Sequence, residues 1–131
     1  MPSFAAFDPA TKKLRPEHLP AIEDRRFTGY TDVSLLTGTA LTVAATHVGD
    51  LISLSNAAPI TVTAPTPTSL GVAAGQIVHF MQGGAGAVTV TAGAGAAVSN
   101  RYNSYVSSGQ FATIELVALS DTAWLLRGEV A

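Results

Sequence analysis

The sequence predicts an all-β domain preceded by an extended N-terminal arm. From residue 39 onward, apolar and polar residues alternate with a period of two, which is typical of half-buried strands. Turn-forming residues separate these segments at intervals of about 8–12 residues, a spacing found in sandwiches and barrels. Charged residues number ten in residues 1–39 but six in residues 40–131. We therefore expect an arm over residues 1–38 and an antiparallel β-sandwich or barrel, of jelly-roll or tulip-like form, over residues 39–131.

The arm combines four prolines with irregularly spaced apolar and aromatic side chains. Each proline biases the preceding residue toward an extended backbone, and Pro20 limits any helix to about one turn near Ala21–Arg26. The arm is either an extended strap over another surface or a disordered tail, and its large apolar residues favour the strap. We expect the strap to contact its partner through apolar side chains and three arginines: Phe4, Phe7, Leu14, Arg15, Leu19, Ile22, Arg25, Arg26, Phe27 and Tyr30.

The body contains a series of short strand-forming segments. Alternating residues occupy 41–44, 52–55, 60–63, 88–91 and 112–119, and a final hairpin pairs 110–120 with 123–129. Residues 77–81 form a continuous apolar run, which predicts a strand covered on both faces. His79 within this run is expected to be a core or interface histidine rather than a metal ligand. Trp124, the only tryptophan, is expected to anchor the core near the last strand.

Composition narrows the classes of function. A net charge of −2 and a pI near 5.8 differ from the basic surface that nucleic-acid binding requires. The chain has no cysteine, which excludes disulfide scaffolds and thiolate sites. No run of about 18 apolar residues occurs, and Asp8 and Pro9 interrupt any signal-peptide core. We expect no cofactor, no metal, no nucleic-acid partner and no membrane partner.

The residues of enzyme chemistry do not form a recognisable constellation. The glycine-rich segment 83–97 lacks the Gly-Lys-Ser/Thr ending of a phosphate loop, so its glycines are expected to make tight turns and allow close packing. His47 lies near Asp50, but no Gly-x-Ser-x-Gly elbow accompanies it. One local group of potential metal ligands is interpreted as a solvated surface: Glu17, His18, Glu23 and Asp24. The sequence therefore predicts that the protein is not an enzyme.

The body is poor in charge for a surface in contact with water. Either exposed Thr, Ser and Gly solvate it, or part of it is buried in a homo-oligomer or a larger assembly. We favour burial, and a trimer over a dimer. A polar and aromatic loop contains Arg101, Tyr102, Asn103 and Tyr105. This loop is either a glycan- or protein-contact patch or a surface loop whose tyrosines pack back onto the sheet.

An ordered series of short motifs resembles small β domains of tailed-bacteriophage virion proteins. The arm segment FDPATKKLRPEHLP is similar to the pattern D-x-x-T-x-x-L-x-x-x-x-L-P in the opening segments of such proteins. The body adds GDLISL, AAPITVTAP, GQIVHF, GAGAVTV and WLLRG, in that order, between residues 49 and 128. Together the motifs cover nearly the whole chain, although each of them is short. Domains of this kind occur in capsid decoration proteins, head spikes, and tail-fibre or baseplate components.

The resemblance implies a non-enzymatic structural protein of the virion, with no catalytic residues to transfer. The expected function is that of a capsid decoration (cement) protein on the outer surface of the phage head, with the major capsid protein as its partner. Such a protein is made in the cytoplasm of the bacterial host. Two alternatives remain: a tail-fibre, baseplate or head-spike component that binds a tail protein, or a carbohydrate-binding module that uses the Tyr102 and Tyr105 loop.

Overall fold

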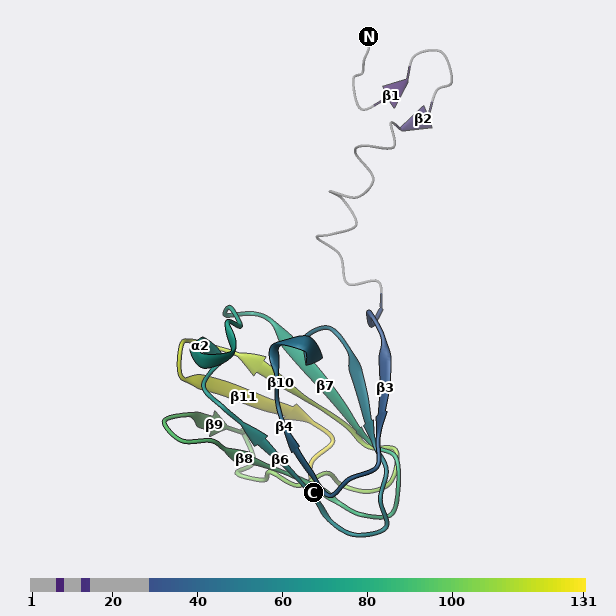
Figure 1. Ribbon diagram of the computed structural model, residues 1–131, viewed down its shortest axis with the longest axis vertical. Coiled ribbons are helices and arrows are strands. Elements are labelled where there is room, and N and C mark those ends of the chain that lie inside the picture. Colours follow the sequence, from purple (N-terminus) through teal and green to yellow (C-terminus); the bar gives the residue numbers. More distant parts are fainter. Residues whose placement is uncertain (1–6, 9–12, 15–28) are drawn as a thin grey trace. The chain divides into compact units, whose positions relative to one another are not determined.

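The computed structural model describes residues 7–8, 13–14 and 29–131, and it divides the chain into two units, residues 1–30 and 31–131. In the first unit, β1 (Phe7–Asp8) pairs antiparallel with β2 (Lys13–Leu14), and Phe7 lies opposite Leu14. The predicted helical turn near residues 21–26 lies outside the described residues. The remaining strands belong to the second unit (Figure 1).

Residues 31–131 are rich in β-strands, in agreement with the predicted all-β class. The six-stranded sheet has the order β3-β5-β7-β10-β11-β9, and the three-stranded sheet has the order β4-β6-β8. The described residues also form a short 3₁₀ turn and a four-residue helix. The bounds are β3 Val33–Leu36, β4 Ala40–Thr42, η2 Ala45–His47, β5 Leu51–Leu54, β6 Ile60–Ala64, α2 Pro67–Leu70, β7 Ile77–Gln82, β8 Val88–Ala92, β9 Ala97–Ser99, β10 Thr113–Ala118 and β11 Ala123–Gly128.

From β3 to β8, each strand lies in the opposite sheet from the strand before it. β3, β5 and β7 belong to the six-stranded sheet, while β4, β6 and β8 belong to the three-stranded sheet (Figure 1). Each strand of the six-stranded sheet and the strand of the three-stranded sheet that follows it form one coil of the chain, and the three coils are β3–β4, β5–β6 and β7–β8. Corresponding strands of successive coils pair in parallel, with Leu51 opposite His79 and Ile60 opposite Val88. The prediction of an antiparallel body is therefore wrong for these strands. Among the named strands of this unit, only β7–β10 and β10–β11 pair antiparallel.

The physical reason for this difference is that a period of two occurs in parallel and antiparallel strands alike. A short turn between two alternating segments usually indicates a hairpin. Here the turn after β3 carries the chain to the other sheet, where Ala40 lies opposite Thr61 of β6. Parallel neighbours require a crossover of about a dozen residues or more. Between β3 and β8, an intervening strand of the opposite sheet forms part of each crossover.

The β unit also begins earlier in the chain than residue 39. Residues 33–36, which fall within the predicted arm, form β3 and pair in parallel with β5. The sequence Val-Ser-Leu-Leu does not show clear alternation, because Val33 and Leu35 are exposed while Ser34 and Leu36 are half-buried. Because apolar residues occupy the exposed positions of β3, apolar character does not identify its core-facing residues. The boundary between the units lies at residues 30 and 31.

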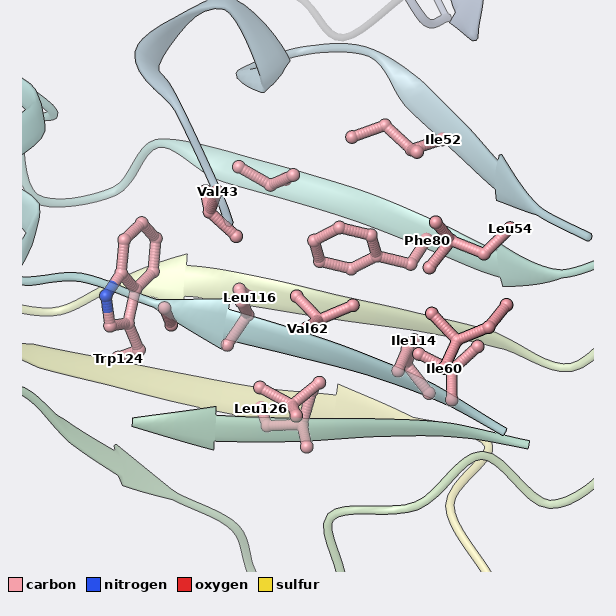
Figure 2. Packing of buried hydrophobic residues seen from close by; sticks show 14 of the residues in the cluster. Val43, Ile52, Leu54, Ile60, Val62, Phe80, Ile114, Leu116, Trp124 and Leu126 are labelled. Atoms are coloured by element: carbon pink, nitrogen blue, oxygen red, sulfur yellow. The ribbon is translucent and has the colours of Figure 1, made fainter. Parts of the chain in front are cut away.

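Alternate residues of both sheets contribute to one buried apolar core (Figure 2). Trp124, the predicted core anchor, is completely buried, and its indole Nε1 donates a hydrogen bond to the Pro65 carbonyl at 2.7 Å. This bond joins β11 of the six-stranded sheet to the segment that follows β6 of the three-stranded sheet. Phe80 of β7 and Val62 of β6 are also fully buried in the same cluster.

Residues 105–108 connect the two sheets at the edge of β8. On one side, Val90 N donates to Tyr105 O at 2.9 Å and Ser107 N donates to Val88 O at 2.9 Å. On the other side, Ser108 N donates to Glu129 O at 2.9 Å, just beyond β11. The edge of β8 is therefore covered. β3 and β4 of the first coil are instead terminal strands of their sheets in the part of the chain that the structure describes.

Candidate interaction surface

The outer face of the six-stranded sheet is its face away from the core. Val78, Phe80 and Gln82 of β7 are buried, so the alternate residues 77, 79 and 81 lie on the outer face. The strand register extends this assignment to the neighbouring strands. His79 lies opposite Leu51 on one side and opposite Glu115 on the other, and Glu115 lies opposite Arg127.

A polar row of three side chains crosses the middle of this outer face. The Nε2 atom of His79 lies 3.2 Å from the Oε1 atom of Glu115, and the Nε atom of Arg127 donates a hydrogen bond to the other carboxylate oxygen of Glu115. The His79 and Glu115 side chains are 16% and 18% exposed, whereas that of Arg127 is 61% exposed. Glu115 thus holds both neighbours, and the guanidinium group of Arg127 is the part of the row most accessible from outside.

Apolar side chains surround the polar row. Val33 and Leu35 of β3 are exposed at 61% and 66%. The half-buried apolar residues of the outer face are Leu51, Ile77, Met81, Val117 and Leu125. A sheet face exposed to water normally carries polar residues at alternate positions. The outer face therefore carries apolar residues at positions that are usually polar on a sheet face in contact with water.

The strand with the apolar run illustrates this point. The prediction that residues 77–81 form a strand is correct, but the expectation that both of its faces are covered is not met within residues 29–131. Its core face is buried, whereas Ile77, His79 and Met81 are only partly covered on the outer face. Neighbouring side chains on the same face shield one another to this extent. The run is nearly all apolar because Ile77 and Met81 on the outer face of β7 are apolar as well, and both remain partly exposed.

The predicted contact loop divides into an exposed part and a packed part. Arg101, Tyr102 and Asn103 are exposed, and the guanidinium carbon of Arg101 lies 5.4 Å from the centroid of the Tyr102 ring. Tyr105 is half-buried and packs against the core cluster, so it is not an exposed contact residue. Its hydroxyl group lies 3.4 Å from the Oδ1 atom of Asn103. The two tyrosines therefore do not form one shared exposed surface.

Most of the predicted arm contacts lie outside the described residues: Phe4, Arg15, Leu19, Ile22, Arg25, Arg26 and Phe27. The backbones of Phe7 and Leu14 belong to β1 and β2. Tyr30 is 40% exposed. The group Glu17, His18, Glu23 and Asp24 also lies outside the described residues. Within the described ranges, no cluster of three or more His, Cys, Asp or Glu side chains is positioned to hold a metal ion, and no helix is long and apolar enough to cross a membrane.

His47 has a structural role at the 3₁₀ turn η2. Its Nδ1 atom accepts a hydrogen bond from the Ala44 N–H at 2.9 Å, which requires that nitrogen to be unprotonated. Desolvation by burial lowers the pKa of His47 below its ordinary value of 6.5, and the nearby Asp50 carboxylate opposes this shift only in part. The folded protein therefore binds a proton at His47 less readily than the unfolded chain does.

We expect the stability that His47 contributes to be complete above about pH 6.5 and to decrease as the pH falls through its lowered folded pKa. His47→Asn keeps a side-chain acceptor for Ala44 but removes the titrating group. Urea unfolding midpoints at pH 7.5 and pH 5.0 should therefore differ less for this variant than for the native chain. Equal differences in the two proteins would show that His47 does not contribute to the pH dependence.

Comparisons with known proteins do not assign this chain to a family. No family model matches it, and neither a curated protein nor a solved structure matches it. The geometry of the outer face and the sequence motifs are therefore the basis for any functional conclusion.

Sequence reasoning did not identify the polar row across the outer face. His79, Glu115 and Arg127 come from three strands, and their contact depends on the register that places Glu115 between the other two. A signal was nevertheless present in the sequence. One histidine in an apolar run and one glutamate in an alternating strand are both positions where an unpaired polar group would be unfavourable. Each residue predicts a polar partner on an adjacent strand, although neither identifies it.

Proposed function

We propose that the protein is a non-enzymatic structural component of a bacteriophage virion, specifically a capsid decoration protein on the outer surface of the head. The observation that carries this proposal is the apolar outer face of the six-stranded sheet. The ordered motif series, which resembles tailed-phage virion proteins, supports it independently. We also propose that the two sheets are the layers of a β-sandwich, joined at one side by residues 105–108.

The outer face suits adhesion to a protein lattice. Residues 31–131 contain only seven charged side chains, and two of them, Glu115 and Arg127, neutralise each other within the polar row. Covering the surrounding apolar side chains would contribute roughly 25 cal/mol for each Å² removed from water. The exposed Arg127 provides an oriented polar contact for a capsid carboxylate or carbonyl group. Many identical contacts on one lattice would add avidity to a modest individual affinity.

The arm provides the second attachment in this proposal. Its aromatic and aliphatic residues would lie across neighbouring capsid subunits, and its arginines would pair with capsid carboxylates. Among the residues that the structure describes, every member of the apolar core cluster lies within residues 31–131. Removing residues 1–30 should therefore abolish binding to capsids while the remaining chain keeps its β-rich circular dichroism spectrum. Full occupancy by the shortened chain would show that the arm is not an attachment.

The direct test is the number of copies per purified virion, measured by quantitative mass spectrometry against the major capsid protein. Hundreds of copies are expected for a protein on the capsid lattice. Between about three and a few dozen copies would indicate a tail, fibre or head-spike component, because those structures have low symmetry-related copy numbers. Absence from particles would overturn the virion proposal.

A pair of variants tests the outer face itself. Leu125→Glu introduces a charge among the apolar residues of this face, and Thr61→Glu introduces the same charge at an exposed position of the three-stranded sheet. Capsid binding, measured by co-sedimentation with particles that lack the protein, should decrease for Leu125→Glu only, because desolvation of an unpaired charge opposes docking. Equal binding by both variants would exclude the outer face as the contact surface.

The exposed ring of Tyr102 beside Arg101 keeps carbohydrate binding as a second candidate function. Because Tyr105 is packed against the core cluster, this candidate depends on Tyr102 rather than on both tyrosines. Binding to a glycan array that Tyr102→Ala abolishes would favour it. An array without a binding glycan would exclude this alternative for the glycans tested.

A further inference from the structure

Among the strands that the structure describes, β3 is a terminal strand of the six-stranded sheet, and its pairing with β5 determines which of its backbone groups face the outer edge of this sheet. Asp32 O accepts a hydrogen bond from Leu51 N at 3.0 Å, and Leu36 O accepts one from Ser55 N at 2.9 Å. Even-numbered residues of this segment therefore direct their backbone groups toward β5. The N–H and C=O groups of Val33 and Leu35 consequently face away from the sheet.

Within Val33–Leu36, β3 carries none of the usual features that prevent strands from pairing with other chains, although the Asp32 carboxylate just before it accepts a hydrogen bond from the Val33 N–H. Such edges commonly carry a charged side chain, a proline or a bulge, or are very short. β3 has four residues without charge or proline, and its two outer-face side chains, Val33 and Leu35, are large, apolar and mostly exposed. The edge strands β4 and β9 have only three residues each and expose small side chains such as Ala40 and Ser99. β3 is therefore the least protected edge of the described unit.

We propose that β3 pairs antiparallel with β3 of a second copy of this chain, with Val33 opposite Leu35 of the other copy and Ser34 opposite Ser34. This register is self-complementary, because residues 33 and 35 both direct their N–H and C=O groups toward the outer edge of the sheet. Each of the two Val33–Leu35 pairs would exchange two backbone hydrogen bonds. The N–H of Val33, which now donates to the exposed Asp32 carboxylate at 2.8 Å, would donate to the partner instead.

The occupant of the edge is inferred to be a second copy because the same register also matches the side chains. Directly opposite residues of an antiparallel pair lie on the same face of the sheet. Val33 and Leu35 both lie on the outer face, so the pairing places apolar beside apolar on that face. The two six-stranded sheets would become one continuous sheet, related by a twofold axis through Ser34. The outer faces of both copies would then point in the same direction.

This inference goes beyond the proposed function and does not depend on it. Pairing concerns the isolated full-length protein, whereas the virion proposal concerns capsid binding and copy number. A dimer that is absent from virions would leave the pairing intact and overturn the decoration proposal. A monomer that decorates capsids would overturn the pairing and leave the decoration proposal intact.

Sedimentation velocity of the full-length protein over a range of concentrations tests the pairing with charge variants. The native chain is expected to form dimers. Val33→Lys/Leu35→Lys should weaken the dimer by about tenfold or more, because lysines would lie directly opposite each other. Val33→Glu/Leu35→Lys should restore it, since a glutamate at position 33 would face a lysine at position 35 of the second copy. A native monomer, a native trimer, or equal loss of association in both variants would overturn the proposal.

Cysteine substitution provides an independent test of the register, because the chain has no cysteine of its own. In the proposed register, residue 34 is a non-hydrogen-bonded pair with Cα atoms about 4.5 Å apart, within the range that a disulfide can span. Ser34→Cys should therefore form a covalent dimer under mild oxidation. Ser99→Cys, at the opposite edge of the same sheet, should remain monomeric on a non-reducing gel. Failure of Ser34→Cys to cross-link, or equal cross-linking by both variants, would overturn the register.

Discussion

Trp124→Ala is expected to lower the free energy of unfolding by about 3–5 kcal/mol, the largest effect of any single core truncation in this protein. Trp124 is completely buried, and its removal would leave a cavity between the two sheets. The same change removes the hydrogen bond from the indole to the Pro65 carbonyl. Domains of this size are typically stable by about 5–15 kcal/mol, so the variant would lose a large share of its stability.

Urea unfolding followed by far-UV circular dichroism provides the measurement, because Trp124 is the only tryptophan and its fluorescence is lost in the variant. Trp124→Phe is the matched control, since it keeps an aromatic ring but leaves the Pro65 carbonyl without its donor. That loss alone should cost about 1–3 kcal/mol. If Trp124→Ala costs less than about 1 kcal/mol, the indole does not anchor the core.

The sequence was a good guide to the core-facing residues because one physical rule determines them. Alternate positions of a half-buried strand face the core, and Ile60 and Val62 of β6, like Ile114 and Leu116 of β10, follow this rule. The final hairpin and the burial of Trp124 follow from the same alternation and from the turn at residues 120–122. Local patterns of this kind do not depend on which strands are neighbours.

The arrangement of the strands could not be predicted in the same way. Parallel and antiparallel neighbours share the period of two, so the alternation at β5 is compatible with either partner direction. β3 was missed because the apolar Val33 and Leu35 are exposed while the polar Ser34 is half-buried, so the apolar residues of this short segment do not mark its core face. The turn at residues 37–39 does not form a hairpin. It leads the chain from β3 to β4, which belongs to the other sheet.

The candidate surface depends even more strongly on register. The polar row exists because Glu115 lies opposite both His79 and Arg127, and a shift of one residue would move Glu115 to the core face. Tyr105 illustrates the same dependence. Its position in a polar loop suggested exposure, but its backbone pairs with that of Val90 and its side chain packs against the core cluster. Residue types identified the candidates, but long-range pairing decided which of them share a surface.

The parallel coils also explain the glycines that precede β8. Turns of three successive coils lie against one another through Asn56, whose Nδ2 atom donates to Thr37 O at 2.6 Å and whose carbonyl accepts from Gly86 N at 2.7 Å. A second side-chain contact, from Ala58 N to Asn56 Oδ1 at 2.9 Å, holds the middle turn. Close packing of glycine beside these turns was expected from the sequence. The coil arrangement provides its physical reason, since each turn rests on the backbone of the preceding one.

Gly86→Ala is expected to be the second most damaging substitution, with a loss of about 3 kcal/mol or more in the free energy of unfolding. A Cβ atom at Gly86 would lie 1.9 Å from the Ala58 carbonyl oxygen and 2.7 Å from the Asn56 carbonyl oxygen. Both are backbone atoms, which cannot move aside by a change of rotamer. The turn would have to withdraw, and the hydrogen bond from Gly86 N to Asn56 O would be lost with it.

Gly109→Ala is the matched control, because no heavy atom lies within 4 Å of its Cβ position and its backbone does not have a positive φ. This control should change stability by no more than about 1 kcal/mol, and in the stabilising direction, because alanine reduces the entropy of the unfolded chain. The free energies of unfolding of the two variants, measured by chemical denaturation under identical conditions, separate the two effects. Gly86→Ala reports the steric clash, and Gly109→Ala reports the general effect of adding a methyl group. If both variants are equally stable, the turns of successive coils are not packed as closely as the contacts of Gly86 require.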